Sequence, residues 1–304
     1  MSRLPPKASF LWTGFEGGVS CIAVVRRNGR SCVAIGTKKG RVELYDEETR
    51  LLDSILYEDP QERGIIWIGT FNGNIVIHVR TFALLCFTES ADGFEILLTT
   101  QHYGHCAASL FGSLLAIPDL EDKTSVVHVM KENEAEAKRI PLQNQDWMLM
   151  CLSIAEESNS LFIGWDSGCV EQRSIDTGDK RASFKLTNEP IFAICSTSSS
   201  LFAATSTSPI HVLRIVAEVL VDEKETIDYN LSATGCSCLR LTPSEKTIFA
   251  SFWDGSLRAY STKKRSLLLA LQVCQGSPIQ SLCVATNQKF YTGDDLGQVF
   301  FWNV

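Results

Sequence analysis

Long hydrophobic runs are absent from this chain of 304 residues. No apolar stretch approaches the roughly eighteen residues that a membrane-spanning helix needs. The first residues, "MSRLPPKASF", contain no apolar stretch followed by a small-residue cleavage site, so a secretory signal is not predicted. We therefore expect a protein of the cytoplasm, the nucleus or both, with no membrane partner.

An excess of basic charge is also absent. The chain has 28 Lys and Arg against 35 Asp and Glu, which gives a net charge of −7 and a pI near 5.3. Surfaces that bind nucleic acid carry a basic excess, because they neutralise phosphates. The compact basic cluster at residues 263–265 is interpreted as a solvated turn, so no direct nucleic acid partner is predicted.

The usual motifs of metal sites and catalytic centres are missing as well. There is no Cys-x-x-Cys pair and no His at zinc-ligand spacing. No phosphate-binding loop, nucleophile elbow or His-Glu-x-x-His motif occurs. The adjacent acids Asp294 and Asp295 are interpreted as solvated turn residues. We therefore predict no metal, no cofactor, no catalytic residues and no enzymatic activity.

Cysteine, in contrast, is abundant and regularly spaced. Among the 11 cysteines, intervals of 45, 44, 43 and 45 residues separate Cys106, Cys151, Cys195, Cys238 and Cys283. Cys21 lies 85 residues before Cys106, which is two such periods. Each of them sits in a short apolar run. A period of about 40–47 residues with several strands per unit is typical of a β-propeller.

A second repeated pattern agrees with the first. An apolar strand, a tight turn and another apolar strand recur, as in "LFIGWDSGCVEQRSI" and "IFASFWDGSLRAYS". The turns centre near residues 40, 168, 208, 255 and 297, with less regular ones near 81 and 122. Glycines at four of these turns supply the left-handed conformation that a hairpin requires. Seven periods of about 43 residues cover the chain.

The cysteines have a packing explanation in such a ring. They are predicted on the innermost strand of each repeat, where space is tight and a small apolar side chain fits better than a leucine. Cys236 and Cys238 are two apart and are predicted to share one face of a strand. They are interpreted as small core residues, with a redox pair as the alternative.

The last repeat must also be completed by a fourth strand so that the ring of repeats closes. The final repeat stops at its third strand, and "ASFLWT" (8–13) is an unassigned apolar strand. We predict that this segment pairs beside residues 298–303, which removes an exposed sheet edge. The fold class is therefore an all-β, seven-bladed WD40-type β-propeller with degenerate repeats, formed as a single domain by residues 1–304.

The Trp-Asp pair that ends the third strand of a WD repeat is missing. The last two residues of the third strands, here called third-strand exits, are instead predicted to be Tyr45-Asp46, His128-Val129, Arg173-Ser174, Leu213-Arg214, Tyr260-Ser261 and Trp302-Asn303. The usual Asp–His–Ser–Trp hydrogen-bond network should therefore be absent from most repeats. Cohesion must then depend mainly on apolar packing.

The two Trp-Asp pairs that do occur are predicted in the turn between the second and third strands. The acids there are most simply turn formers, whose carboxylates accept backbone N–H bonds. The tryptophans have two open interpretations, packing at the rim or anchoring of a partner. The predicted partner-binding rim consists of Trp165, Asp166, Trp253, Asp254, Asp294, Asp295 and Trp147.

Two polar segments interrupt the repeats. "KENEAEAKR" (131–139) is helix-prone and is predicted to link strands three and four of the third repeat. "AEVLVDEKETIDYN" (217–230) is interpreted as an acidic insertion in the fifth repeat. Both are interpreted as solvated linkers, with docking protrusions as the alternative.

The chain resembles the WD-repeat family of guanine nucleotide-binding protein subunit beta-like protein 1 / ASTRA-associated protein 1. The resemblance is carried by "SEKTIFASFWDGSLRAYSTKKRSLLLALQVCQGSPIQSLCVATNQKFYTGDDLGQVFFWN" (244–303), by "SLLAIPDLEDKTSVVHV" (113–129) and by "SLFIGWDSGCV". The second repeat, the 217–230 segment and the loss of the Trp-Asp exits depart from a typical member.

The resemblance implies a non-catalytic propeller that associates with the Tel2–Tti1–Tti2 co-chaperone and supports the maturation of phosphatidylinositol-3-kinase-related kinases. It also implies a place in chromatin-associated complexes. One alternative is a substrate receptor or peptide reader for a ubiquitin ligase or chromatin complex, with Trp165 and Trp253 as aromatic walls of an axial pocket. Another is an enzyme with axial acids.

Overall fold

Short alternating apolar patterns place the chain in β-strands throughout. The computed structural model describes residues 6–88, 93–134, 136–142, 147–229 and 235–304. Within these ranges it contains 28 strands, which form seven four-stranded antiparallel sheets, numbered here 1 to 7 in chain order. Backbone contacts divide the chain into two compact units, unit 1 (Met1–Ile68 and Tyr229–Val304) and unit 2 (Gly69–Asp228).

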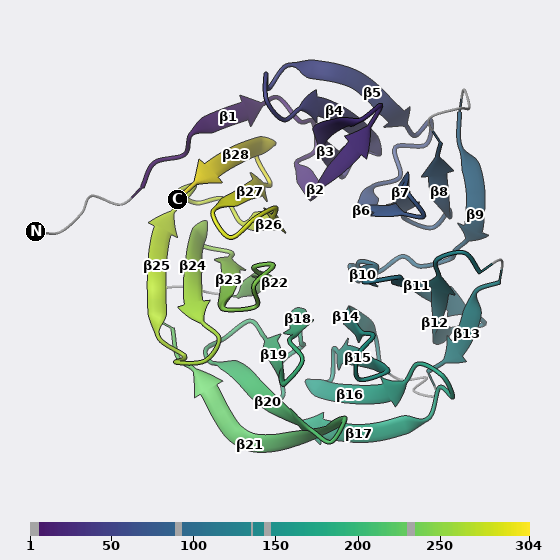
Figure 1. The fold of residues 1–304 in the computed structure, drawn as a ribbon, viewed down its shortest axis with the longest axis vertical. Helices are drawn as coiled ribbons and strands as arrows, with labels where there is room; N and C mark the ends of the chain where they lie inside the picture. The colour runs from purple at the N-terminus through teal and green to yellow at the C-terminus, as the bar shows by residue number, and fades with distance from the viewer. Residues whose placement is uncertain (1–5, 89–92, 135, 143–146, 230–234) are drawn as a thin grey trace, which may run out of the picture. The chain divides into compact units, whose positions relative to one another are not determined.

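Unit 1 contains sheets 1, 6 and 7 (Figure 1). Sheet 1 consists of β2 (Val19–Arg27), β3 (Arg30–Thr37), β4 (Arg41–Asp46) and β5 (Leu52–Glu58). Sheet 6 consists of β22 (Cys236–Leu241), β23 (Thr247–Phe252), β24 (Ser256–Ser261) and β25 (Leu267–Gln272). Sheet 7 consists of β26 (Ile279–Val284), β27 (Lys289–Asp294), β28 (Gln298–Asn303) and β1 (Phe10–Thr13).

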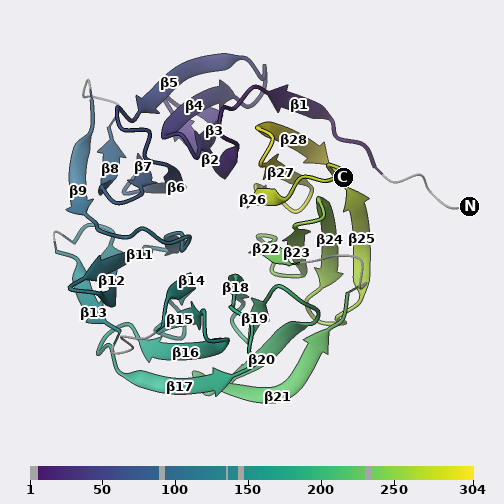
Figure 2. The ribbon, with the colours of Figure 1, turned by 180° about the vertical axis from the view of Figure 1, so that it is seen from behind.

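Unit 2 contains sheets 3, 4 and 5 (Figure 2). Sheet 3 consists of β10 (Ser109–Phe111), β11 (Leu114–Glu121), β12 (Thr124–Lys131) and β13 (Lys138–Pro141). Sheet 4 consists of β14 (Leu149–Ala155), β15 (Ser160–Trp165), β16 (Cys169–Ser174) and β17 (Lys180–Lys185). Sheet 5 consists of β18 (Ala193–Ser196), β19 (Ser200–Ala204), β20 (Ile210–Val216) and β21 (Val219–Ile227).

Sheet 2 begins at the boundary between the units. It consists of β6 (Ile65–Phe71), β7 (Asn74–Val79), β8 (Ala83–Phe87) and β9 (Glu95–Thr99). The last three of these strands belong to unit 2. The described residues include no helix of a length and hydropathy that could cross a membrane.

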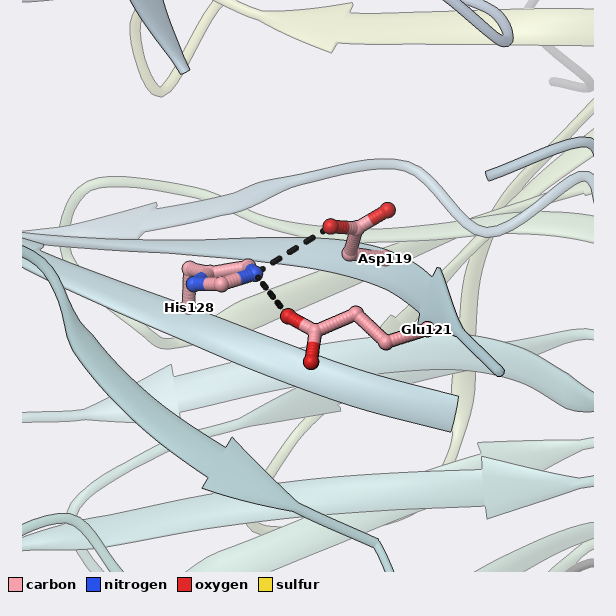
Figure 3. Close-up of side chains that lie close together, drawn as sticks. All are labelled: Asp119, Glu121 and His128. Atoms are coloured by element: carbon pink, nitrogen blue, oxygen red, sulfur yellow. Dashed lines mark hydrogen bonds and ion pairs between the residues drawn. The ribbon is translucent and has the colours of Figure 1, made fainter. Parts of the chain in front are cut away.

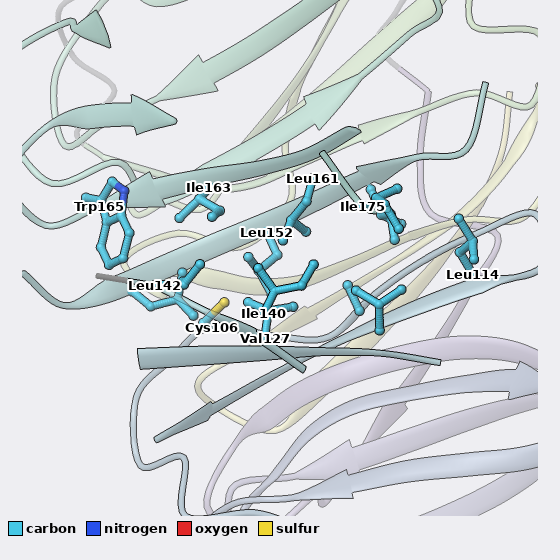
Figure 4. Packing of buried hydrophobic residues seen from close by; sticks show 14 of the residues in the cluster. Cys106, Leu114, Val127, Ile140, Leu142, Leu152, Leu161, Ile163, Trp165 and Ile175 are labelled. Carbon is cyan, nitrogen blue, oxygen red and sulfur yellow. The ribbon is translucent and has the colours of Figure 1, made fainter. Parts of the chain in front are cut away.

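The first strands of neighbouring sheets pack against one another within each unit. In unit 2, β14 contacts both β10 and β18, and in unit 1, β26 contacts both β2 and β22. Sheets 3 and 4 share one hydrophobic cluster, in which Leu161 and Ile163 of β15 face Val127 and Ile140 of sheet 3 (Figure 4). Closely packed apolar layers of this kind are the main source of stability in such a fold.

Three of the regularly spaced cysteines, Cys21, Cys151 and Cys238, connect neighbouring sheets. The Cys21 thiol donates to the Ile65 carbonyl at 3.8 Å, where the next sheet begins. The Cys151 thiol donates to Ile191 O at 3.2 Å. The Cys238 thiol makes the same kind of bond to Gln280 O at 3.2 Å. The thiol of one first strand therefore reaches the backbone at the start of the next sheet, a physical reason for spacing these cysteines about one repeat apart.

Glycines face two of these cysteines across the first hairpin. Gly36 is the cross-strand neighbour of Cys21, and Gly164 is that of Cys151. A Cβ at Gly36 would lie 2.6 Å from Cys21 Sγ, and one at Gly164 would lie 2.5 Å from Cys151 Sγ. Both sides of each contact must therefore be small. Burial raises the pKa of Cys21 to about 12, so the thiol stays protonated.

Two details of the cysteine prediction need correction. Cys106 lies in the segment that precedes β10, not on the first strand of sheet 3. Cys236 and Cys238 are separated by a register irregularity in the β22–β23 pairing, and their thiols donate to different carbonyls. A β-bulge at this irregularity explains why Cys236 and Cys238 differ, because it interrupts the alternation that would place both side chains on one face of the strand.

The N-terminal strand completes sheet 7, as predicted. β1 pairs antiparallel with β28, with Phe10 opposite Phe301 and Trp12 opposite Val299. The Trp12 indole is buried, and its Nε1 donates to Arg50 O at 3.1 Å. In Figure 1 the purple β1 lies beside the yellow β28. The assignment of residues 1–304 to a single domain stays a prediction.

The segment 217–230 is not an insertion. Its residues 219–227 form β21, the fourth strand of sheet 5. Leu220 and Ile227 are buried, Glu223 and Lys224 between them are exposed, and Asp222 and Glu225 are partly buried. The acidic residues of this segment belong to an edge strand of the sheet. The segment 131–139 does link strands three and four of sheet 3, because it starts at the last residue of β12 and ends within β13.

Two third-strand exits were placed too early. His128-Val129 lies inside β12, and Leu213-Arg214 lies inside β20, because both strands continue for two further residues. The other predicted exits coincide with the ends of β4, β16, β24 and β28.

We expect Gly36→Ala to destabilise the protein by about 1–3 kcal/mol, because the added methyl overpacks the contact with Cys21. Cys21→Ala should offset part of that loss in the double variant, since it removes the clashing sulfur. Thermal unfolding of the wild type, both single variants and the double variant measures this coupling. Strictly additive losses would show that the two side chains do not compete for space.

We expect Trp12→Ala to cost about 3–5 kcal/mol, because it removes a buried indole at the seam between β1 and β28. Leu11→Ala is the matched control, since Leu11 lies in the same strand but is exposed. Urea unfolding of both variants tests the difference. Equal effects of the two substitutions would mean that β1 adds little to the stability of sheet 7.

Candidate functional site

Six of the seven predicted rim residues lie in, or at the start of, the turns that join second and third strands, here called second-to-third turns, and Trp147 lies in the segment that precedes β14. Trp165 ends β15 and is 0% exposed, so its side chain is a packing residue. Trp147 lies against it with the rings edge to face at 6.2 Å, and is 38% exposed. Met148 beside it is also exposed. The surface residues at this position are therefore Trp147 and Met148, supported by Trp165 below.

Polar atoms beneath this aromatic pair are left unpaired. Trp165 Nε1 and Asp166 Oδ1 are buried, and neither has a hydrogen-bond partner among the described residues. The Asp166 N–H donates to Met148 O at 3.0 Å, which ties the turn to the segment that carries Trp147. The turn-forming role predicted for the Asp166 carboxylate is therefore not seen at Oδ1, which has no bond to a described backbone N–H.

The second Trp-Asp pair has a different setting. Trp253 is half-buried and lies directly over Gly235, where an added Cβ would be 2.1 Å from Trp253 Cε3. Asp254 Oδ1 accepts hydrogen bonds from Ser256 N at 2.9 Å and from Ser256 Oγ at 2.6 Å. Asp254 is therefore the turn former that the sequence predicts, and Trp253 covers a glycine backbone while keeping part of its ring accessible.

The pair of acids at the end of β27 is not a pair of solvated turn residues. Asp294 is 1% exposed, and its Oδ1 accepts a hydrogen bond from Gln298 N at 2.9 Å. Burial raises the pKa of this carboxyl above its usual range. Asp295 is partly exposed and forms an ion pair with Lys38. The two carboxylates therefore do not converge as a catalytic pair would.

Sheet 7 retains one link of the WD-type hydrogen-bond network. Trp302 Nε1 donates to Thr292 Oγ1 at 3.2 Å, between the third and second strands. Trp302 also stacks on Phe290, with ring centroids 5.8 Å apart. In sheet 7, Trp302 therefore contributes both a hydrogen bond and the apolar packing that the sequence predicts.

A cavity lies at the opposite strand ends of unit 2. It has a volume of about 260 Å³ and is lined by Phe111, Ile215, Glu157, Glu218 and Ser158, among others. Ser158 Oγ is buried without a hydrogen-bond partner in the described part of the chain. Because β15 begins just after Ser158 and ends at Trp165, this cavity and the Trp147 surface lie at opposite ends of one strand.

Three ionisable side chains of sheet 3 come together in one place (Figure 3). His128 Nε2 lies 3.2 Å from Asp119 Oδ2 and 3.3 Å from Glu121 Oε1. Asp119 and His128 are buried, and Glu121 is partly exposed. Hydrogen bonds from His128, Gln101 N and Leu120 N outweigh burial and lower the pKa of Asp119. The carboxylate is thus ionised at neutral pH.

Sequence reasoning missed this cluster. Its acids are two residues apart, and the histidine follows seven residues later, which matches no metal-binding motif. The sequence signal that could have identified the cluster is the alternation of side chains along a strand, followed by a tight turn. Residues 119 and 121 share one face of a strand, and a hairpin near residue 122 returns a histidine to the same face.

No family model and no curated protein matches the chain. A chain in the crystal structure of the mitotic checkpoint complex, a WD40 propeller, is similar over 99% of this chain and 93% of its own, with a TM-score of 0.80 and 13% identity. The computationally designed Ika8 protein is similar over 96% of this chain and 98% of its own, with a TM-score of 0.67 and 11% identity.

Together with the seven antiparallel sheets, this likeness defines the class. The chain is a seven-bladed WD40-type β-propeller, and the predicted fold class is confirmed.

We expect Asp294→Asn to raise the melting temperature at neutral pH, because it removes a buried charge and keeps an acceptor for Gln298 N. The folded pKa of Asp294 lies above the unfolded one, so the ionised form disfavours folding. The gain should vanish as the pH falls and Asp294 becomes protonated. Thermal melts across this pH range test it, with Asp295→Asn as the partly exposed control. A gain that did not change with pH would contradict the assignment.

Proposed function

We propose that this propeller is a non-catalytic scaffold that binds protein partners at the strand ends where the second-to-third turns lie, together with the segments beside those turns. The observation that supports this most is the exposed Trp147–Met148 pair resting on the buried Trp165. Aromatic side chains held by a rigid layer are the usual anchors of protein interfaces, since little entropy is lost when they bind. Trp253 over Gly235 offers a second, smaller aromatic surface in unit 1.

The competing functions fit these residues less well. A peptide reader with Trp165 as a pocket wall would need an accessible ring, and Trp165 has no exposed surface. An enzyme that used Asp294 and Asp295 together would need converging carboxylates, whereas Asp294 is buried and Asp295 pairs with Lys38.

The partner we propose is a Tel2–Tti1–Tti2-type co-chaperone, through which the scaffold supports the maturation of phosphatidylinositol-3-kinase-related kinases. Support comes from the resemblance of residues 244–303 to the beta-like protein 1 / ASTRA-associated protein 1 family. Chromatin-associated complexes are part of the same proposal, which places the protein in the cytoplasm, the nucleus or both.

Affinity purification of the full chain from its own cells, followed by mass spectrometry, tests the partner. Recovery of the co-chaperone subunits or a kinase of that family is the expected result. Recovery of ubiquitin-ligase adaptors without them would favour the substrate-receptor alternative. Recovery of neither, from a folded bait, would contradict the proposal.

We expect Trp147→Ala to reduce partner recovery at least tenfold, which corresponds to a loss of about 1.4 kcal/mol. The variant should fold, because Trp147 lies at the surface of the cluster. Trp165→Ala is the matched comparison, and it should lower the melting temperature because that ring is fully buried. Undiminished recovery with folded Trp147→Ala would show that this surface is not the interface.

A further inference from the structure

We propose that Asp119, Glu121 and His128 form a binding site for a divalent transition-metal ion, with Zn²⁺ as the ion that fits best. This site is separate from the Trp147 surface and does not depend on the proposed scaffold function. Its three residues belong to sheet 3 and lie within unit 2.

The backbone brings the three side chains together. Asp119 and Glu121 are alternate residues of β11, so both point to the same face of the sheet. Asp119 is paired with Val126 and Ile117 with His128, which puts His128 diagonally across from Asp119 on that face. The tight turn between β11 and β12 fixes this register, so the arrangement does not depend on a long loop.

The distances suit a tetrahedral ion. Zinc bonds to carboxylate oxygen and imidazole nitrogen measure about 2.0–2.2 Å, which sets neighbouring ligand atoms about 3.3–3.6 Å apart. His128 Nε2 lies 3.2 Å from Asp119 Oδ2 and 3.3 Å from Glu121 Oε1, and all three ligand atoms lie within 4.8 Å of one another. A small movement of Asp119 and Glu121 would complete three corners of the tetrahedron.

Each carboxylate is oriented by its other oxygen. Asp119 Oδ1 accepts hydrogen bonds from Gln101 N and Leu120 N, both at 2.7 Å. Glu121 Oε2 accepts from Arg139, with Nε and Nη2 both at 2.7 Å. Asp119 Oδ2 and Glu121 Oε1 are therefore turned toward the same nitrogen. Ligands held in this way by surrounding donors are typical of metal sites.

The charges also call for a cation. Two carboxylates face one ring nitrogen, which can donate a single proton and so cannot serve both fully. Asp119 is buried, which makes unbalanced negative charge costly. A divalent ion would balance the charge of Asp119, whereas the charge of Glu121 is already paired with Arg139. Glu121 is 36% exposed, so a fourth ligand position can be taken by water.

Metal titration of the full chain tests the site. The protein is purified without a polyhistidine tag, stripped with a chelator and titrated with ZnCl₂ in a calorimeter. One ion per chain and a higher melting temperature with Zn²⁺ are expected. No binding would show that the three groups form a hydrogen-bonded cluster only, and the proposal would be overturned.

Variants locate the ion. His128→Ala should weaken Zn²⁺ binding by more than about 100-fold, which exceeds the 10–100-fold typical of losing an orienting residue. Glu121→Gln should also weaken Zn²⁺ binding. Because the Glu121 side chain is partly exposed, this variant should fold and keeps the test valid if His128→Ala does not fold. His105→Ala, which alters an exposed histidine of the same unit, is the matched control and should bind normally.

Cobalt distinguishes this site from the cysteines. Co²⁺ bound to Asp119, Glu121 and His128 should show a tetrahedral visible spectrum without a sulfur-to-cobalt charge-transfer band. A strong band of that kind would place the ion on the cysteine thiols, and equal binding by wild type, His128→Ala and Glu121→Gln would place it away from the three proposed ligands. Either result would overturn the proposal.

Discussion

Close approach of the first strands is the constraint on which the rest of the structure depends. Where Cys21 meets Gly36, and Cys151 meets Gly164, a single added methyl would overlap a sulfur atom. The same thiols donate to carbonyls of the next sheet, so one small side chain both fits the space and satisfies a backbone acceptor. The regular spacing of these cysteines therefore has a packing explanation.

This packing compensates for the reduced WD-type hydrogen bonding. Sheet 7 keeps a Trp–Thr contact and is completed by β1, with Trp12 buried along the seam. Sheets 3 and 4 are joined by a shared apolar cluster that extends to Trp165. Because these layers are held by apolar contacts and small residues, the turns at the strand ends are free to carry different functions. In unit 2 they present Trp147 at one end of β15 and the cavity beside Ser158 at the other.

Periodicity predicted the parts of the fold that repeat. The cysteine spacing and the strand-turn-strand pattern predicted seven repeats, and the structure contains seven sheets. The strand predicted at residues 8–13 pairs with β28, as expected. Composition was misleading at an edge strand that carries several acids, so β21 was mistaken for an insertion. Burial of Asp294 and Trp165 was not visible either, because it depends on how neighbouring segments pack. The cluster of Asp119, Glu121 and His128 required a hairpin register that no spacing motif encodes.

Hydrogen–deuterium exchange resolved by peptide tests the central claim most directly, since exchange of buried strands reports local stability. The account predicts slowest exchange in the first strands that contact one another, β14 and β18 in unit 2 and β2, β22 and β26 in unit 1. The outer strands β5, β17, β21 and β25 should exchange faster. Slowest exchange in these outer strands would contradict the claim that close contacts between the first strands hold the sheets together.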